Sequence, residues 1–155
     1  MAETAQTVPA LMVALQRGKI LIPAAVAAEV IPYEPLQRIE DTPDWFLGVL
    51  GWRGLRIPVI SYESLTSKRT SFSLVSVASA SLIIVRTLRT RDDIPFYAMV
   101  SQAAPDEIQV SEETLTDSME ELEDTELARA KIGNTVVGIP DMEFIEASLN
   151  EVDFS

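Results

Sequence analysis

The chain has 155 residues, and its 24 acidic residues outnumber its 12 basic residues to give a net charge of −12. This length suits one domain with a substantial core, and a hydrophobic content of 47% excludes general disorder. The chain contains no histidine and no cysteine, which excludes a Ser-His-Asp triad, a thiolate nucleophile, a phospho-acceptor histidine and a disulfide framework. The negative charge argues against binding of nucleic acid, which needs clustered Lys and Arg.

The acidic residues are concentrated in the second part of the chain. Residues 1–91 hold ten basic and seven acidic residues, whereas residues 92–155 hold two basic and seventeen acidic ones. This asymmetry fits two faces with different partners, and it equally fits an acidic half that is simply well solvated. No apolar run reaches the length that spans a bilayer, and the first seven residues lack the basic residue of a secretory signal. We therefore predict a cytoplasmic protein that does not insert into a membrane.

The first half of the chain predicts short strands joined by tight turns. Apolar runs flank Gln16-Arg17-Gly18 and indicate a hairpin, and the alanine-rich run after Pro23 indicates a short helix that Pro32 stops. Two further runs flank Gly51-Trp52-Arg53-Gly54 and are apolar at nearly every position, so both of their faces should be covered. In chain order, the expected elements are strands at 11–15 and 19–22, a helix over 24–29, strands at 36–39, 45–50 and 55–60, and a helical turn at 63–66.

The second half of the chain also predicts short strands joined by tight turns, and it follows a serine-rich connector. Pro140 is the expected first residue of a helix over 141–149, with Met142, Ile145 and Leu149 on one face. The other expected elements are strands at 81–88 and 94–101 around a polar turn at 89–93, a strand at 108–110, and a last hairpin of 127–132 with 135–139 that turns at Gly133-Asn134.

Short strands at even spacing, with no strand–long helix–strand unit, favour small β-barrels over a doubly wound sheet. We predict a mainly β single domain over residues 1–155, with a break near residues 67–80 that divides it into two half-domains sharing one core. No internal sequence repeat is visible. Residues 111–126 carry eight acidic residues and no basic one, and both an amphipathic helix and an exposed loop fit this segment.

The most informative element is the hairpin tip Gly51-Trp52-Arg53-Gly54. Trp and Arg are frequent interface anchors, so this pair in an acidic protein is a candidate contact site. The structural alternative is that Trp52 packs on the domain's own core and Arg53 pairs with a local carboxylate. The glycines at 48, 51 and 54 precede a strand instead of opening a helix, so they do not form a phosphate loop.

Residues 22–60 resemble the CheW-like coupling domains. The family's Asn-Leu-Arg-Gly stands here as Gly51-Trp52-Arg53-Gly54, and the proline strand that follows it stands as Ile57-Pro58-Val59-Ile60. The resemblance continues more weakly through the last hairpin and residues 141–145, so it covers most of the chain. Further matching pairs are Glu29-Val30, Arg38-Ile39, Thr42-Pro43 and Gly48-Val49.

This resemblance implies a pair of five-stranded SH3-like barrels that share one hydrophobic core, with short helices. It implies a non-catalytic adaptor, without a cofactor or metal, that couples the cytoplasmic tip of a methyl-accepting chemoreceptor to the regulatory domain of a CheA-type histidine kinase. Carried over by position, Arg53 would lie in the receptor-facing groove, Gly48 in a tight region sensitive to substitution, and Glu29 near the contact surface. The partner-binding residues that we predict are Glu29, Gly48, Leu50, Trp52, Arg53 and Gly54.

Two departures from the family pattern narrow the resemblance. Ser61-Tyr62 replaces the usual Asp-Leu after the proline strand, and Gly51-Trp52 replaces Asn-Leu. With the Trp-Arg pair, these residues resemble the ChpC branch, the coupling proteins of type IV pilus (twitching) systems. The alternative from another class is a small carboxylate-dependent enzyme or a metal-binding domain that uses the acidic C-terminal half. Residues 117–126 lack the glycine that a calcium loop needs.

Overall fold

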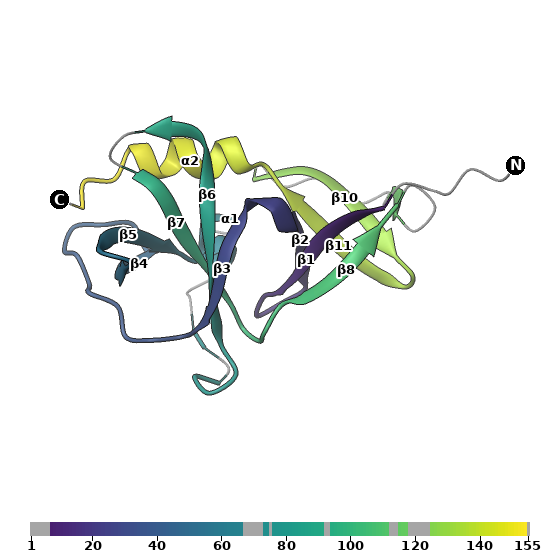
Figure 1. Ribbon diagram of the computed structural model, residues 1–155, viewed down its shortest axis with the longest axis horizontal. Coiled ribbons are helices and arrows are strands. Elements are labelled where there is room, and N and C mark those ends of the chain that lie inside the picture. The colour runs from purple at the N-terminus through teal and green to yellow at the C-terminus, as the bar shows by residue number, and fades with distance from the viewer. Residues whose placement is uncertain are drawn as a thin grey trace, which may run out of the picture.

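The computed structural model describes residues 7–66, 73–74, 76–91, 94–111, 115–117 and 125–154, which form two curved β-sheets side by side (Figure 1). One sheet contains β1 (Val8–Ala14), β2 (Lys19–Pro23), β8 (Asp106–Val110), β9 (Leu115–Asp117), β10 (Glu126–Ile132) and β11 (Thr135–Pro140). The other contains β3 (Ala27–Pro32), β4 (Phe46–Trp52), β5 (Leu55–Ile60), β6 (Ser81–Arg91) and β7 (Ile94–Ser101). The described helical elements are η1 (Ala24–Val26), α1 (Tyr62–Thr66) and α2 (Met142–Asn150).

The mainly β fold class is confirmed. The strand orders are β8-β1-β2-β11-β10-β9 in the six-stranded sheet and β3-β6-β7-β5-β4 in the five-stranded sheet. The four antiparallel hairpins expected from the sequence are present as β1–β2, β4–β5, β6–β7 and β10–β11. The short strand β9 adds a sixth member to one edge, so each sheet retains a common set of five strands.

The helix expected over residues 24–29 is wrong beyond its first turn. Only Ala24–Val26 forms a 3₁₀ turn, and the chain then continues as β3, which pairs antiparallel with β6 from Ala27 to Pro32. A six-residue helix makes too few hydrogen bonds to offset the cost of its nucleation. Pairing with a long central strand satisfies the same backbone groups, so the tertiary contact overrides the helix propensity of the alanines.

Two shorter predictions also need correction. Of the strand expected at 36–39, only Gln37 pairs, in an isolated bridge with Val49. Pro140 is the last residue of β11 and does not open the final helix. Asp141 is the helix N-cap, and its carboxylate accepts hydrogen bonds from the backbone N–H groups of Glu143 and Phe144. The predicted apolar face of α2 is confirmed, because Met142, Ile145 and Leu149 are all buried.

The two sheets do not divide the chain near residues 67–80. β5 and β7 lie on opposite sides of that segment in sequence, yet they pair in parallel within one sheet. The six-stranded sheet instead combines the first hairpin with strands after residue 105. Within residues 111–126, the described part includes strand β9, which pairs with β10 and was not among the two alternatives considered. The rest of that acidic segment, and residues 92–93 of the predicted turn, lie outside the described residues.

Three hydrophobic clusters hold this arrangement together. Alternate residues of a strand face opposite sides, so each central strand contributes to two clusters at once. In β6, Leu82 and Ile84 point into the interior of the five-stranded sheet, whereas Ile83 and Val85 point into a cluster between the sheets. That shared cluster also receives Leu11 from β1 and residues of both α-helices. The predicted common core is therefore present, and α2 crosses from β11 to cover it (Figure 1).

The two sheets contain a structural repeat that the sequence does not reveal. Each unit has a hairpin with a bulge in its first strand, followed directly by a helix. The corresponding elements start 80 residues apart, at Phe46 and Glu126 for the first strand and at Tyr62 and Met142 for the helix. Both sheets share one pairing pattern, in which all pairs are antiparallel except one. The parallel pair is β5–β7 in the first unit and β11–β2 in the second. The β1–β2 hairpin takes the place of β6–β7, so the second unit is circularly permuted.

The hydroxyl group of Tyr97 is a defect in the shared core. Tyr97 is fully buried, burial raises the pKa of its phenol, and its hydroxyl has no hydrogen-bond partner among the described residues. By contrast, the buried hydroxyl of Tyr62 donates to Thr125, with Oγ1 at 3.1 Å and the carbonyl oxygen at 3.3 Å. An unsatisfied buried polar group lowers stability, whereas a paired one does not.

We therefore expect opposite effects from removing these two hydroxyls. Tyr97→Phe should raise the free energy of unfolding by about 1 kcal/mol, and Tyr62→Phe should lower it by about 1 kcal/mol or more. Urea denaturation of both variants beside the parent chain measures the difference. A loss of stability in Tyr97→Phe comparable to that in Tyr62→Phe would show that the Tyr97 hydroxyl has a buried partner.

Candidate partner-binding site

The tip of the β4–β5 hairpin is a two-residue turn. Trp52 pairs with Leu55, so Arg53 and Gly54 alone connect the strands. Both residues have positive φ angles, 48° for Arg53 and 78° for Gly54, as a type I′ turn requires. Glycine adopts this conformation freely, but an arginine seldom does. The turn therefore holds Arg53 in a fixed position at the end of the hairpin, at some cost in backbone strain.

Trp52 and Arg53 both donate hydrogen bonds to one carboxylate on β3, the other edge strand of this sheet. The indole Nε1–H of Trp52 donates to Glu29 Oε2 at 2.8 Å, and the Arg53 guanidinium donates to Glu29 Oε1 at 3.0 Å. The Arg53 guanidinium carbon also lies 4.6 Å from the centre of the Trp52 ring, a cation–π contact. Glu29 comes from β3, Trp52 is the last residue of β4 and Arg53 lies in the turn, so the cluster ties the loop end of the hairpin to the opposite edge of the sheet.

The hydrogen bonds of this cluster keep the Glu29 carboxylate negatively charged. The pKa of Glu29 is lowered from its ordinary value, first by the Trp52 hydrogen bond and then by Arg53. Glu29 is therefore ionised at neutral pH and keeps accepting both bonds. The Arg53 side chain is 66% exposed, so its guanidinium is oriented by the protein and still open to solvent. An oriented and exposed guanidinium is suited to bind a carboxylate or a carbonyl oxygen of another protein.

The predicted site residues separate into accessible and buried ones. Arg53 and Gly54 lie at the exposed tip, and Glu29 is partly exposed beside it. The Trp52 ring is buried and meets Phe96 edge-on at 5.0 Å, so the structural alternative considered for the Trp-Arg pair describes its packing. Leu50 is 1% exposed within the interior of the five-stranded sheet, so its side chain offers no surface to a partner. We correct the expectation for Leu50 to a core role.

Gly48 allows the backbone of β4 to lie in close contact with the backbone of Gln37. Its φ angle is 150°, and a Cβ atom placed there would lie 2.6 Å from the carbonyl oxygen of Gln37. The residue after it, Val49, exchanges backbone hydrogen bonds with Gln37 at 2.8 and 3.0 Å. Gly48 thus allows the β3–β4 linker to press against β4. Sequence reasoning missed this contact and also missed Phe96, because neither partner is near the hairpin in sequence.

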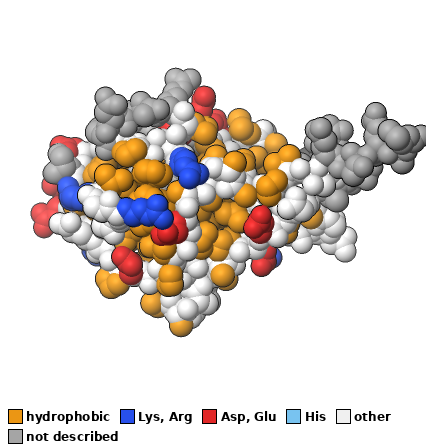
Figure 2. Space-filling model, in the orientation of Figure 1, with side chains coloured by type: hydrophobic (Ala, Val, Ile, Leu, Met, Phe, Trp, Pro, Cys, Tyr) orange, Lys and Arg blue, Asp and Glu red, His pale blue; other side chains and the backbone are white. Residues whose placement is uncertain are grey.

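Two apolar residues next to the cluster in sequence are exposed. Val30, next to Glu29 on β3, is 40% exposed, and Leu55 at the tip is 38% exposed. Figure 2 shows hydrophobic side chains gathered over much of one face, interrupted by a few charged groups. Surfaces of this composition, apolar with scattered arginine and acidic residues, are typical of protein–protein contact sites.

The net charge of the chain is distributed unevenly along the sequence. Residues 24–101, which contain the five-stranded sheet, hold eight basic and eight acidic residues and are neutral. The remaining residues hold four basic and sixteen acidic ones and carry the whole net charge of −12. Within the described chain, no group of three or more acidic residues is placed to hold a metal ion. No helix there is long and apolar enough to cross a bilayer.

Two sheets that share one core, with an exposed arginine at the tip of one hairpin, define a two-barrel β module. The family model for the CheW-like domain matches residues 9–148, and the chain belongs to this family. The fold is similar to the crystal structure of the scaffolding protein TtCheW from Thermoanaerobacter tengcongensis, with a TM-score of 0.74 and 18% sequence identity. That match covers 100% of this chain and 95% of the other. No curated protein sequence matches the chain.

The contact at Gly48 predicts a sharp difference between two glycines of β4. Gly48→Ala should lower the free energy of unfolding by about 2 kcal/mol, because the new methyl group meets the Gln37 carbonyl and the backbone conformation disfavours it. Gly51→Ala should stay within about 0.5 kcal/mol of the parent, since nothing lies within 4 Å of its Cβ position. Urea denaturation compares the two. Equal effects would contradict the role assigned to Gly48.

Proposed function

We propose that this protein is a non-catalytic adaptor that couples a chemoreceptor to a CheA-type histidine kinase in a signalling array. The observation that carries the proposal is the match of a CheW-like domain to residues 9–148, over nearly the whole described chain. The similar fold of TtCheW, described as a scaffolding protein, supports a role in assembly. An adaptor needs surfaces and no reactive groups, which agrees with a chain that lacks histidine and cysteine.

The partners follow from the family and the surfaces follow from the structure. We propose that the regulatory domain of the kinase and the cytoplasmic tip of a methyl-accepting receptor both bind this chain in the cytoplasm. Arg53 is the best-placed residue for such a contact, because Glu29 and Trp52 hold it in one orientation while most of its side chain stays exposed. Ordering of the side chain before binding reduces the entropy lost on association.

The pathway is a finer part of the proposal. The sequence departures at Gly51-Trp52 and Ser61-Tyr62 favour the ChpC branch, and hence a type IV pilus (twitching) array, over flagellar chemotaxis. The structure gives the first departure a physical meaning. Trp52 supplies both the ring under Arg53 and a hydrogen bond to Glu29, which a leucine at that position does not supply. The change therefore alters how the arginine is held.

The adaptor role predicts recovery of a kinase without chemical modification of this chain. Tagged protein incubated with the native cytoplasm should recover a CheA-type kinase, identified by mass spectrometry. Incubation of the purified chain with the phosphorylated kinase should leave no stable label on it, because no phospho-acceptor histidine is present. Stable labelling, or failure to recover any such kinase, would count against the adaptor and in favour of the carboxylate-dependent alternative.

The role of Arg53 is tested by a pair of matched charge reversals. Arg53→Glu should weaken binding of a partner by about tenfold or more, because reversing an oriented interface charge costs at least 1.4 kcal/mol on the scale of such contacts. Arg56→Glu makes the same change at an exposed position of the same hairpin and should bind normally. Both variants should melt within a few degrees of the parent, since the side chains are exposed.

Titration calorimetry with the kinase regulatory domain and with a receptor-tip fragment measures both variants. Equal losses in the two variants would show a general effect of charge. A large fall in melting temperature for Arg53→Glu alone would show that the arginine stabilises the fold and does not primarily bind a partner.

A further inference from the structure

A cavity of about 370 Å³ lies where the two sheets meet, away from the Arg53 cluster. Its wall combines the β1–β2 turn and β2 with α1 and the β10–β11 hairpin, so residues of both repeat units line it. This volume lies in the range of small-molecule sites in proteins. Neither the family match nor the proposed coupling function assigns a ligand to it.

Basic residues are concentrated at this cavity. Outside residues 24–101 the chain has only four Lys and Arg residues among sixteen acidic ones. Three of those four line the cavity, and they are Arg17, Lys19 and Arg129. Because basic side chains lower the electrostatic energy of a nearby anion, this grouping makes the cavity a favourable place for a negatively charged ligand.

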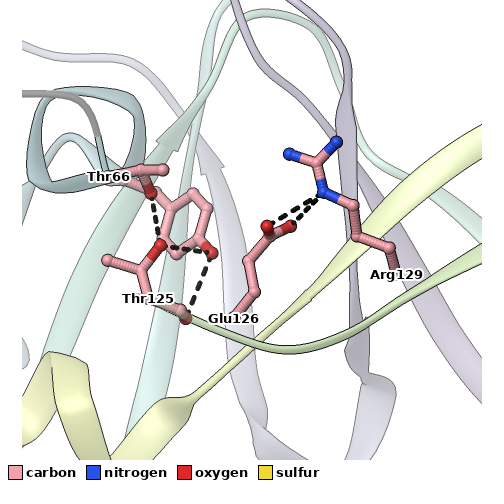
Figure 3. A network of polar contacts seen from close by, with 5 residues as sticks. Thr66, Thr125, Glu126 and Arg129 are labelled. Atoms are coloured by element: carbon pink, nitrogen blue, oxygen red, sulfur yellow. Dashed lines mark hydrogen bonds and ion pairs between the residues drawn. The ribbon is translucent and has the colours of Figure 1, made fainter. Parts of the chain in front are cut away.

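The acidic residues of the wall are already engaged. Burial raises the pKa of the Glu63 carboxyl group, and the nearby backbone N–H group of Gln16 and side chain of Gln102 offset part of this effect. The Glu126 side chain is only 4% exposed and accepts from Arg129 Nε, with Oε1 at 2.9 Å and Oε2 at 3.2 Å. Figure 3 shows that the two terminal nitrogens of Arg129 point away from this carboxylate. Arg17 and Lys19 are exposed at the rim, and the described lining residues include three basic and two acidic side chains.

Comparison of the repeat units shows that this polar wall replaces a hydrophobic contact. Glu126 and Arg129 occupy the positions of Phe46 and Val49, which are buried apolar residues in the first unit. A buried ion pair is seldom more stabilising than the apolar pair it replaces. Gly138 makes room for it, because a Cβ atom there would overlap the Glu126 carboxylate. Next to it, Tyr62, Thr66 and Thr125 form a hydroxyl network (Figure 3).

We propose that this cavity binds a small molecule that carries a carboxylate or phosphate group, held by Arg17 and Lys19 at its rim. The Glu126–Arg129 pair and the hydroxyl of Thr66 make the rest of the wall polar, which suits a ligand with further hydrogen-bonding groups. Because α1 belongs to one repeat unit and β10 to the other, an occupant contacts both sheets and fixes their relative position. The site lies apart from the partner surface, so a bound metabolite can reach the adaptor without blocking the arginine tip.

The test uses the full chain with inorganic phosphate and succinate as separate probes, and chloride at equal ionic strength as the blank. Backbone amide chemical shifts and the melting temperature are recorded up to millimolar concentrations. We expect saturable shifts centred on Gly18, Gly138 and Thr125 with at least one probe, and the two probes distinguish a phosphate ligand from a carboxylate ligand. Arg17→Gln with Lys19→Gln should weaken the apparent affinity about tenfold or more.

Arg38→Gln with Arg56→Gln is the matched control, since both arginines are exposed and neither lines the cavity. It should leave the affinity unchanged. The proposal is overturned if neither probe gives saturable shifts in the parent chain, or if both double variants lose affinity equally. Should the first double variant fold poorly, the two single replacements provide the same comparison. Loss of kinase recovery would concern the adaptor role alone, because these probes do not depend on it.

Discussion

Both sheets depend on the cluster of side chains packed between them. Central strands such as β2, β6 and β7 are apolar on both faces because one face fills the interior of its own sheet and the other fills the shared core. The two helices that end the repeat units, α1 and α2, add Leu65, Ile145 and Leu149 to the same cluster. Neither sheet can therefore be removed without exposing the apolar face of the other, and the two barrels form one cooperative unit.

This shared core also determines what remains for function. The side chains of the central strands are buried in the core. The polar groups that a partner can reach therefore lie at hairpin tips, on edge strands and at the boundary between the two sheets. The Glu29–Trp52–Arg53 cluster uses a tip and an edge strand, where a buried indole supports an exposed guanidinium. The cavity beside Glu126 lies at that boundary. The first surface suits a macromolecule, and the second suits a small anion.

The sequence predicts the hairpins well because their signals are local. Apolar runs around Arg53-Gly54 and Gly133-Asn134 define strands whose registers the turns then fix. The sequence fails where a distant segment decides the outcome. Residues 27–29 have helix propensity, yet β6, more than fifty residues later, draws them into a strand. The Glu29 carboxylate meets Trp52 only because of that pairing, so the sequence alone does not show that these two predicted site residues lie together.

The repeat explains a further limit of sequence reasoning. The second unit keeps the bulge, the turn and the following helix of the first at a constant spacing, so backbone geometry is retained. Side chains at equivalent positions have meanwhile diverged in polarity, from Phe46 and Val49 to Glu126 and Arg129. A hydrophobic pattern search compares polarity and therefore misses the repeat at the positions that changed most. The same backbone accommodates either pair, so packing alone does not require the charged one. An ion pair beside a cavity is therefore better explained by binding of a ligand than by stabilisation of the fold.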